Sequence, residues 1–300
     1  MNGFTASVRH ELLCTRRARM PHLLLVVFVG MVAVSVFIGW SGRSTVSAVY
    51  HQITAQGLTS APDPFKATSP LYYTHNAVIY VVLIGALLAI LLGVQATIRD
   101  RKAATSVLVL SRPGGRAGRL LGQLTALSIV LAVAMAAGTV ISWVGITVIT
   151  GSALGPDATL RLAAFGVVSC VFLAGFALIG MLSGIYCKKE TTALLAPVIA
   201  WSVITFVLPQ LGTAARPVAL LNPVPSVPPP HGGFFGVVNM FVGPISITEQ
   251  FKTVAGVLLG NDSATGSPAE GVVILAAFLA ILIALVLLTS RQRLRSPLNE

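Results

Sequence analysis

The chain has 300 residues, of which 55% are hydrophobic and only 10% are charged. A soluble domain carries roughly 25% charged residues, so this composition excludes an ordinary soluble protein and indicates a chain that lies mostly in lipid. The formal net charge of +11 gathers near the ends of long apolar segments. It is therefore interpreted as a signal of membrane orientation, and nucleic acid is not expected as a partner.

Residues 1–22 are predicted to form a cytoplasmic amphipathic helix that lies on the inner leaflet. Its apolar residues recur at helical spacing on one stripe, and its basic residues lie elsewhere, where each contributes about 1 kcal/mol near anionic lipid. The residues that carry this prediction are Phe4, Val8, Arg9, Leu12 and Arg16. The apolar run from Leu23 to Trp40 is too long for a signal peptide and is predicted to be an uncleaved first span.

Six segments have the roughly 20 apolar residues that a helix needs to cross the hydrocarbon core. They are residues 23–41, 77–97, 124–149, 161–185, 192–212 and 270–290. Helices are expected because lipid offers no partner for an unpaired backbone group. The predicted fold is therefore an all-α integral membrane protein with six transmembrane helices, five of them within residues 23–212.

The distribution of Lys and Arg sets the predicted orientation. Both tails and the second and fourth connections hold 15 of these residues, and the other three connections hold five. Because cytoplasmic loops carry the excess of basic residues, both termini, including the tail 291–300, are predicted to face the cytoplasm. The membrane that holds the chain is expected to be the plasma or inner membrane of the cell.

The second connection, residues 99–119, has a pattern that a simple tether would not need. A polar start is followed by an apolar patch at Val107–Leu110, a break at Pro113-Gly114-Gly115, and a basic return toward the third span. This pattern predicts a short helix, a turn and a second helix start at the cytoplasmic face. An apolar patch in that place is typical of a surface that docks into the groove of a partner.

This segment resembles the connection between the second and third spans in permease subunits of ABC-2 type transporters, in particular an exporter group of that family described as NosY-like. In the family an acidic residue is followed by Gly-Thr, a leucine run, a Ser/Thr-x-Pro-x-x-Arg turn and Leu-Gly-Lys. The chain departs from that pattern at Ala104 and Gln123, which replace the usual Gly and Lys. The residues assigned to ATPase coupling by this resemblance are Asp100, Arg101, Thr105, Val107, Leu108, Leu110, Pro113, Arg116 and Gly122.

The resemblance implies a permease that forms the pathway of an exporter and is driven by a separate ABC ATPase. Two ATPase subunits would bind ATP and Mg, and a second permease, identical or related, would complete the complex. In the family the N-terminal helix also flanks the ATPase, although a role as a lipid anchor only stays open. The chain contains no GxxxxGK[ST] phosphate loop, so no cofactor is expected in it and it is not expected to be an enzyme. The alternative for the basic residues of 99–119 is that they serve membrane orientation alone.

Small residues and scattered thiols complete the features of the spans. Gly180 and Gly184 form a GxxxG in the fourth span, which predicts close helix packing within the subunit or, alternatively, a dimer contact. No metal site is expected, because the cysteines are scattered and the outward histidines match no ligand spacing. The cysteines are Cys14, Cys170 and Cys187, and the outward-side candidates are His51, His75, His231 and Met240.

The fifth connection, residues 213–269, is predicted to be a large outward-facing loop. It opens with a proline-rich stretch that favours extended backbone. Ser246 and Glu249 then have the spacing of a capping box, and the residues after them recur at helical spacing. A short amphipathic helix at the outer membrane surface is predicted from Ser246, Ile247, Glu249, Phe251, Val254 and Leu258. Such a loop is also a possible recognition surface for an outer-side protein.

The polar content of the spans separates the classes of function. None has a clear interior Asp, Glu, Lys or Arg, and this argues strongly against a proton-coupled carrier and less strongly against a passive pore. A membrane enzyme is not expected, because paired carboxylates, HExxH and a clustered Ser/His/Asp set are lacking. An ATP-driven permease is therefore the preferred function, and a passive or secondary transporter and a non-transporting scaffold or sensor stay open.

Overall fold

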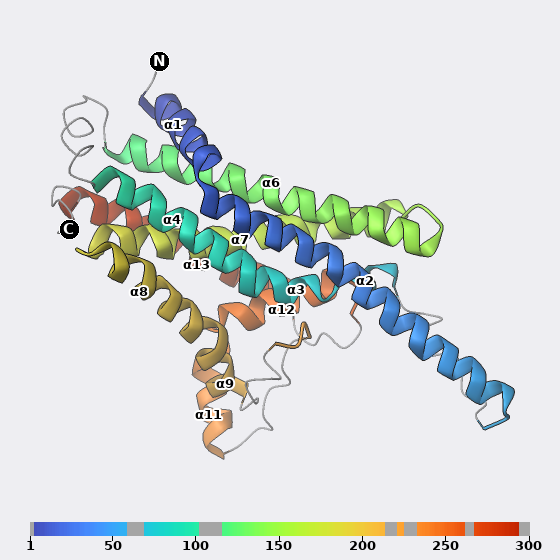
Figure 1. Cartoon of the computed structure of the whole chain (residues 1–300). Coiled ribbons are helices and arrows are strands. Elements are labelled where there is room, and N and C mark those ends of the chain that lie inside the picture. The colour runs from blue at the N-terminus through green and yellow to red at the C-terminus, as the bar shows by residue number, and fades with distance from the viewer. Residues whose placement is uncertain are drawn as a thin grey trace.

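The computed structural model describes residues 3–58, 69–101, 116–213, 221–224, 233–261 and 267–293. Every regular element within these residues is a helix (Figure 1). The first half of the chain forms α1 (Gly3–Arg17), α2 (Arg19–Ala55), η1 (Pro70–Thr74), α3 (Ala77–Tyr80), η2 (Val81–Gly85), α4 (Ala86–Arg101) and α6 (Arg116–Thr150). The second half forms α7 (Pro156–Tyr186), α8 (Glu190–Ser202), η3 (Val203–Val207), α9 (Leu208–Thr213), α11 (Gly233–Val242), α12 (Ile247–Leu258) and α13 (Pro268–Arg293).

Six helical segments are long and apolar enough to cross a bilayer. They are Arg19–Ala55, Pro70–Arg101, Gly118–Thr150, Pro156–Tyr186, Glu190–Gly212 and Pro268–Thr289. Each one overlaps one of the six segments that the sequence predicts, so the prediction of an all-helical protein with six potential spans is confirmed. The second and fifth of them each contain one π-helical turn, η2 and η3, which changes the direction in which the following side chains point.

The second and fourth of these segments form the centre of the bundle. In their most apolar windows 67% and 56% of residues are buried, against 17–33% in the other four. The core includes Phe172, Phe176 and Leu173 of α7 and Leu88 and Leu92 of α4. The helices α2, α6, α8 and α13 surround α4 and α7 and leave apolar faces exposed, as expected of surfaces that meet lipid or another subunit.

The close packing of α4 on α7 depends on glycines. A methyl group at Gly180 would meet the carbonyl oxygen of Ile90, and one at Gly184 would meet the side chain of Thr97. From the other helix, Gly93 faces the carbonyl oxygen of Ala177 in the same way. The structure thus places the predicted GxxxG inside the subunit, where small residues let two backbones approach.

We expect Gly180→Ala to lower the free energy of unfolding by about 1–3 kcal/mol, because the added methyl group would overpack this contact. The measurement is denaturant unfolding of the purified protein in mixed micelles. Gly30→Ala in α2 is the matched control, because no atom lies within 4 Å of a methyl group there. That control should be neutral or stabilise the protein by up to about 1 kcal/mol. Equal effects of the two variants would contradict the packing argument.

The sequence predicts that α12 is an amphipathic helix at the outer membrane surface, but the structure buries it against other helices. Ile247, Phe251 and Val254 are buried against the protein, and Phe251 stacks on Phe172 of α7 with ring centroids 4.3 Å apart. The predicted capping box is not formed, because the side chain of Ser246 makes no capping hydrogen bond. The periodicity correctly indicated a helix here. Its apolar face packs on α7, which precedes it by about 80 residues in the chain, and not on lipid.

Two elements project from the bundle (Figure 1). The helix α11 was not predicted, and it packs beside α9 with Phe234, Val237 and Met240 exposed. Asn239 is the one polar side chain among its ten residues, so the segment lacks the broad polar face by which a surface helix is identified in a sequence. The second element is the end of α2, which continues past Gly39, where the backbone of Tyr73 in η1 packs on the helix. Among the described side chains from 41 to 58, none is buried.

Candidate functional site

The predicted coupling residues that the structure describes lie at one end of the bundle. Asp100 and Arg101 end α4, Arg116 is the first residue of α6, and Gly122 lies one turn and a half into α6. The helix α1 crosses this same end, which we call the α1 end (Figure 1). The predicted Thr105, Val107, Leu108, Leu110 and Pro113 lie outside the described residues.

Asp100 joins the end of α4 to the start of α6. Its two carboxylate oxygens accept hydrogen bonds of 2.6 and 2.5 Å from the guanidinium of Arg119, and the side-chain amide of Gln123 donates a third, of 2.8 Å. Gln123 also donates to the carbonyl oxygen of Ala96 at 3.0 Å. A bidentate pair between a carboxylate and a guanidinium is both strong and directional. The two ends of the connection 102–115 are therefore held together.

Gln123 also gives a physical reason for one departure from the family pattern. Its side chain is buried, and the charge of Asp100 is already balanced by Arg119. A lysine at this position would bring a second cation into a buried place with one carboxylate, and burying an unbalanced charge is costly. A neutral amide keeps the hydrogen bond without adding a charge, and its cost is a buried Oε1 atom that has no hydrogen-bond partner among the described residues.

Glu11 ties α1 to the same cluster. Its buried carboxylate forms an ion pair with Arg99 of α4, and Ser7 donates a hydrogen bond of 3.0 Å to the carbonyl oxygen of Arg119. Burial raises the pKa of the Glu11 carboxyl and Asp100 raises it further, whereas Arg99 and Arg119 lower it. Arg99 and Arg119 thus offset part of the cost of burying a charge. The three helices α1, α4 and α6 share one charged cluster.

The close approach of α1 to α6 depends on Gly122. A methyl group at this position would lie 2.7 Å from the side-chain carbon of Ser7 and 3.1 Å from the carbonyl oxygen of Phe4. The resemblance assigned Gly122 to the return into the third span. The structure gives it a contact with the N-terminal helix, which sequence reasoning did not foresee.

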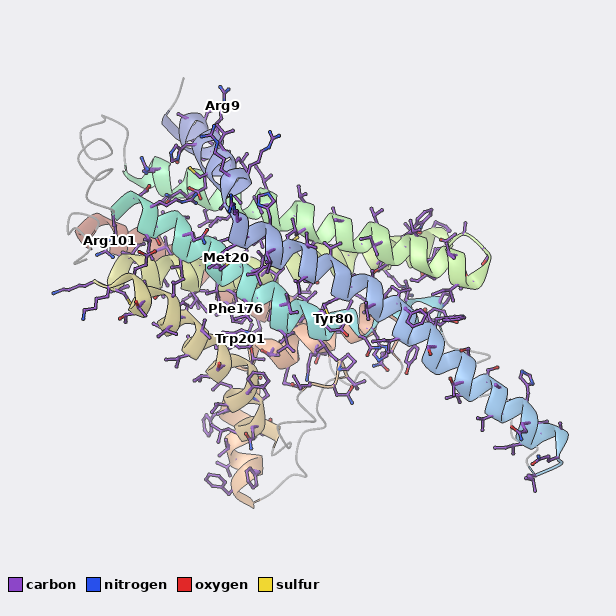
Figure 2. All side chains as sticks on the ribbon, viewed as in Figure 1. Arg9, Met20, Tyr80, Arg101, Phe176 and Trp201 are labelled. Carbon is purple, nitrogen blue, oxygen red and sulfur yellow. The ribbon has the colours of Figure 1, made fainter. Side chains whose placement is uncertain are left out.

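The residues of α1 that are buried against the protein differ from the apolar stripe that the sequence assigned to the inner leaflet. Glu11 and Thr15 are buried, whereas Phe4 is exposed and Val8 and Leu12 are half-buried. Arg9 and Arg16 are exposed, and Figure 2 shows Arg9 on the outer side of α1. Sequence reasoning missed Glu11. Its signal was that it is the one acidic residue among the first 62 of a basic and apolar sequence.

Arg101 stabilises the end of a neighbouring helix and does not present its charge to solvent. Its side chain is 2% exposed, and its Nη1 atom lies 2.6 Å from the carbonyl oxygen of Gly184, 2.7 Å from that of Cys187 and 3.1 Å from that of Ile185, so that its two hydrogens are shared among three acceptors. These are the last carbonyls of α7, which lack partners within the helix and carry its negative dipole end. Arg101 therefore caps α7 and is not one of the charges presented to solvent (Figure 2).

A third charged pair lies far from the α1 end, in α12. The Nζ atom of Lys252 is 2.8 Å from the carboxylate of Glu249, and the two side chains are 3% and 11% exposed. Thr248 donates to the carbonyl oxygen of Ile204 at 3.3 Å, while the buried hydroxyl of Thr205 has no partner among the described residues. The apolar spans thus do pack against ionisable groups, but these come from the fifth connection. Among the described residues, no group of His, Cys, Asp and Glu could hold a metal ion.

Comparison with known proteins agrees with this architecture. The family model described as ABC-2 family transporter protein matches residues 5–293 and so covers nearly the whole chain, from α1 to the end of α13. It does not distinguish the NosY-like group within the family. A search of curated proteins finds no match. The chain therefore belongs to the ABC-2 transporter family and is a multi-pass membrane protein that forms a permease subunit of an ABC transporter.

Proposed function

We propose that this chain is the pathway-forming subunit of an exporter in the cell membrane, driven by a separate ATPase that docks at the α1 end. The ATPase, present in two copies, would bind ATP and Mg²⁺, and the chain itself would hydrolyse nothing. The family match and the lack of a GxxxxGK[ST] loop in the sequence support this division. Both termini would face the cytoplasm, in accord with the excess of Lys and Arg on that side.

The observation that carries the proposal is the cluster around Asp100. The connection 102–115 leaves α4 at Arg101 and returns at Arg116, and the pair of Asp100 with Arg119 clamps its two ends. A force applied to that connection by an ATPase would reach α4 and α6 together. The pair of Glu11 with Arg99 would include α1 in the same movement.

Arg101 extends the mechanical link to α7. Because its guanidinium binds three carbonyl oxygens at the end of α7, the ends of α4 and α7 would also move as one body. A second permease, identical or related, would pack on one of the exposed apolar faces. Closure of the two ATPases on ATP would then rotate the two permease halves against each other and open the pathway outward.

The test combines purification with a variant of the connection. We expect an ABC ATPase to copurify with the tagged chain from native membranes and to hydrolyse ATP faster in its presence. The double variant Pro113→Ala with Arg116→Glu should reach the membrane at normal abundance and lose this stimulation, because the turn that the sequence predicts at Pro113 would link the connection to α6. Arg161→Glu, at the start of α7, is the matched control and should keep it.

Three results would contradict the proposal. Stimulation that is unchanged in the double variant would remove the coupling role of the connection. Transport or leak through the purified chain without any ATPase would favour a passive or secondary transporter. A soluble outer-side partner that binds the chain in the absence of any transport would favour a scaffold or sensor.

A further inference from the structure

A cavity of about 160 Å³ lies where α1 meets the bundle, next to the turn between α1 and α2. Four helices supply its apolar wall. The residues that form this wall are Leu12 of α1, Leu25 of α2, Leu88 of α4 and Val130 of α6. An apolar cavity of about 150 Å³ in a soluble protein stays dry and takes up a molecule of the size of benzene. The space here is thus sufficient for the end of a hydrocarbon chain, and it is too small for a whole lipid.

The rim of the cavity is polar and basic. Arg16 and His22 line it, and both residues are exposed, so the cavity reaches the surface of the protein. Among the described residues, Arg16 makes no ion pair, and no acidic residue lines the cavity. The nearest acid on the same helix, Glu11, is buried and paired with Arg99. The rim therefore favours an anion over a cation or a neutral group.

The position of the cavity along the chain matches the boundary between water and lipid. α1 ends at Arg17 and α2 begins at Arg19, and the uninterrupted apolar run of the first span begins at Leu23. With α1 on the inner leaflet, as the sequence predicts, the basic rim is expected toward the lipid headgroups. The apolar wall, which reaches Leu88 in the predicted span 77–97, is then expected toward the acyl chains. A ligand that fits both parts is an amphiphile with an anionic head and a hydrocarbon tail.

We propose that the cavity binds one anionic phospholipid from the leaflet in which α1 lies. The phosphate and the rest of the acidic headgroup would contact the guanidinium of Arg16, and part of one acyl chain would enter between Leu12, Leu25, Leu88 and Val130. The bound lipid would bridge α1 to the three helices beneath it. It would therefore help to hold α1 against the bundle, and this inference does not depend on the proposed function.

The experiment measures lipid retention by the intact purified protein. Detergent-solubilised chain is mixed with phosphatidylglycerol or phosphatidylcholine of the same acyl chains, and bound lipid is counted by native mass spectrometry. We expect phosphatidylglycerol to be retained about fivefold more strongly, which corresponds to one basic contact at the headgroup. Arg16→Gln should remove this preference. Arg17→Gln removes the same charge one residue away, does not line the cavity, and should leave the preference unchanged.

A cavity-filling variant tests the site independently of charge. Val130→Phe should reduce the retention of both lipids, because the ring would occupy the space of the acyl chain. Size-exclusion chromatography identifies a variant that fails to fold, in which case Leu25→Phe takes its place. Equal losses in Arg16→Gln and Arg17→Gln would show attraction to the basic helix in general and would overturn the proposed site. Equal retention of the two lipids by the unaltered chain would overturn it as well.

Discussion

Replacing Lys252 by Met lowers the free energy of unfolding by about 3–5 kcal/mol, because it removes the cation of Lys252 from beside the buried carboxylate of Glu249. Met has a similar length and is apolar, so the change removes the charge and keeps most of the packing around α12. The measurement is denaturant unfolding of the purified protein in mixed micelles. Surrounding helices make this cost large, since Glu249 has little access to water through which it could be solvated.

Two further variants show whether the loss comes from the uncompensated charge. Lys252→Met combined with Glu249→Gln should recover most of the stability, because the double variant buries no net charge. Arg161→Met breaks the pair with Asp157, whose side chains are 49% and 76% exposed, and should cost less than about 1 kcal/mol. If the double variant were as unstable as the single one, lost packing rather than charge would explain the effect.

Reversing the charge at Arg119 by Arg119→Asp abolishes the stimulation of the ATPase, according to the proposed coupling. The change places a carboxylate against Asp100 and removes two charge-assisted hydrogen bonds, each of which is worth about 1.5–3 kcal/mol. Each 1.4 kcal/mol is a factor of ten in an equilibrium, so we expect at least a tenfold loss of stimulation. ATP hydrolysis by the copurified complex is the measurement.

The exchange of the two charges gives the sharper result. Asp100→Arg alone should also uncouple the complex, whereas Asp100→Arg together with Arg119→Asp restores the pair in the opposite direction and should recover part of the stimulation. Arg161→Asp reverses an exposed cation outside the α1 end and should have no effect. Single and exchanged variants that all stimulate like the unaltered chain would show that the clamp between α4 and α6 does not transmit force.

The six potential spans could be predicted because each one is a long apolar run, and such runs are visible in the sequence alone. Their ends could not be predicted as well. The first span was expected at residues 23–41, but α2 continues to Ala55 through a segment rich in Ser and Thr. Hydropathy detects where the chain leaves an apolar composition, and a helix can continue through polar residues beyond that point.

The site was harder to predict, because its contacts join residues that are distant in the chain. Glu11 and Arg99 lie 88 residues apart, and nothing in either local sequence indicates the other. The resemblance places Asp100 at the start of the connection, whereas the structure has it in the last turn of α4. Its partners Arg119 and Gln123 are, from the sequence alone, attributed to membrane orientation and to a departure from the family pattern. Likewise, α12 has the period of a surface helix, and only its distant partner Phe172 explains why it is buried.

The length of α2 has a mechanical consequence. At 1.5 Å per residue its 37 residues extend about 55 Å, well beyond the roughly 30 Å of the hydrocarbon core. Because η1 packs on the helix at Gly39 and none of the described side chains of α2 from residue 41 to Ala55 is buried, the last turns of α2 form an arm that pivots at Gly39. That arm is about 24 Å long, so a tilt of about 10° at the fulcrum sweeps its tip through about 4 Å. Small rearrangements among the packed helices are thereby magnified at the far surface of the protein.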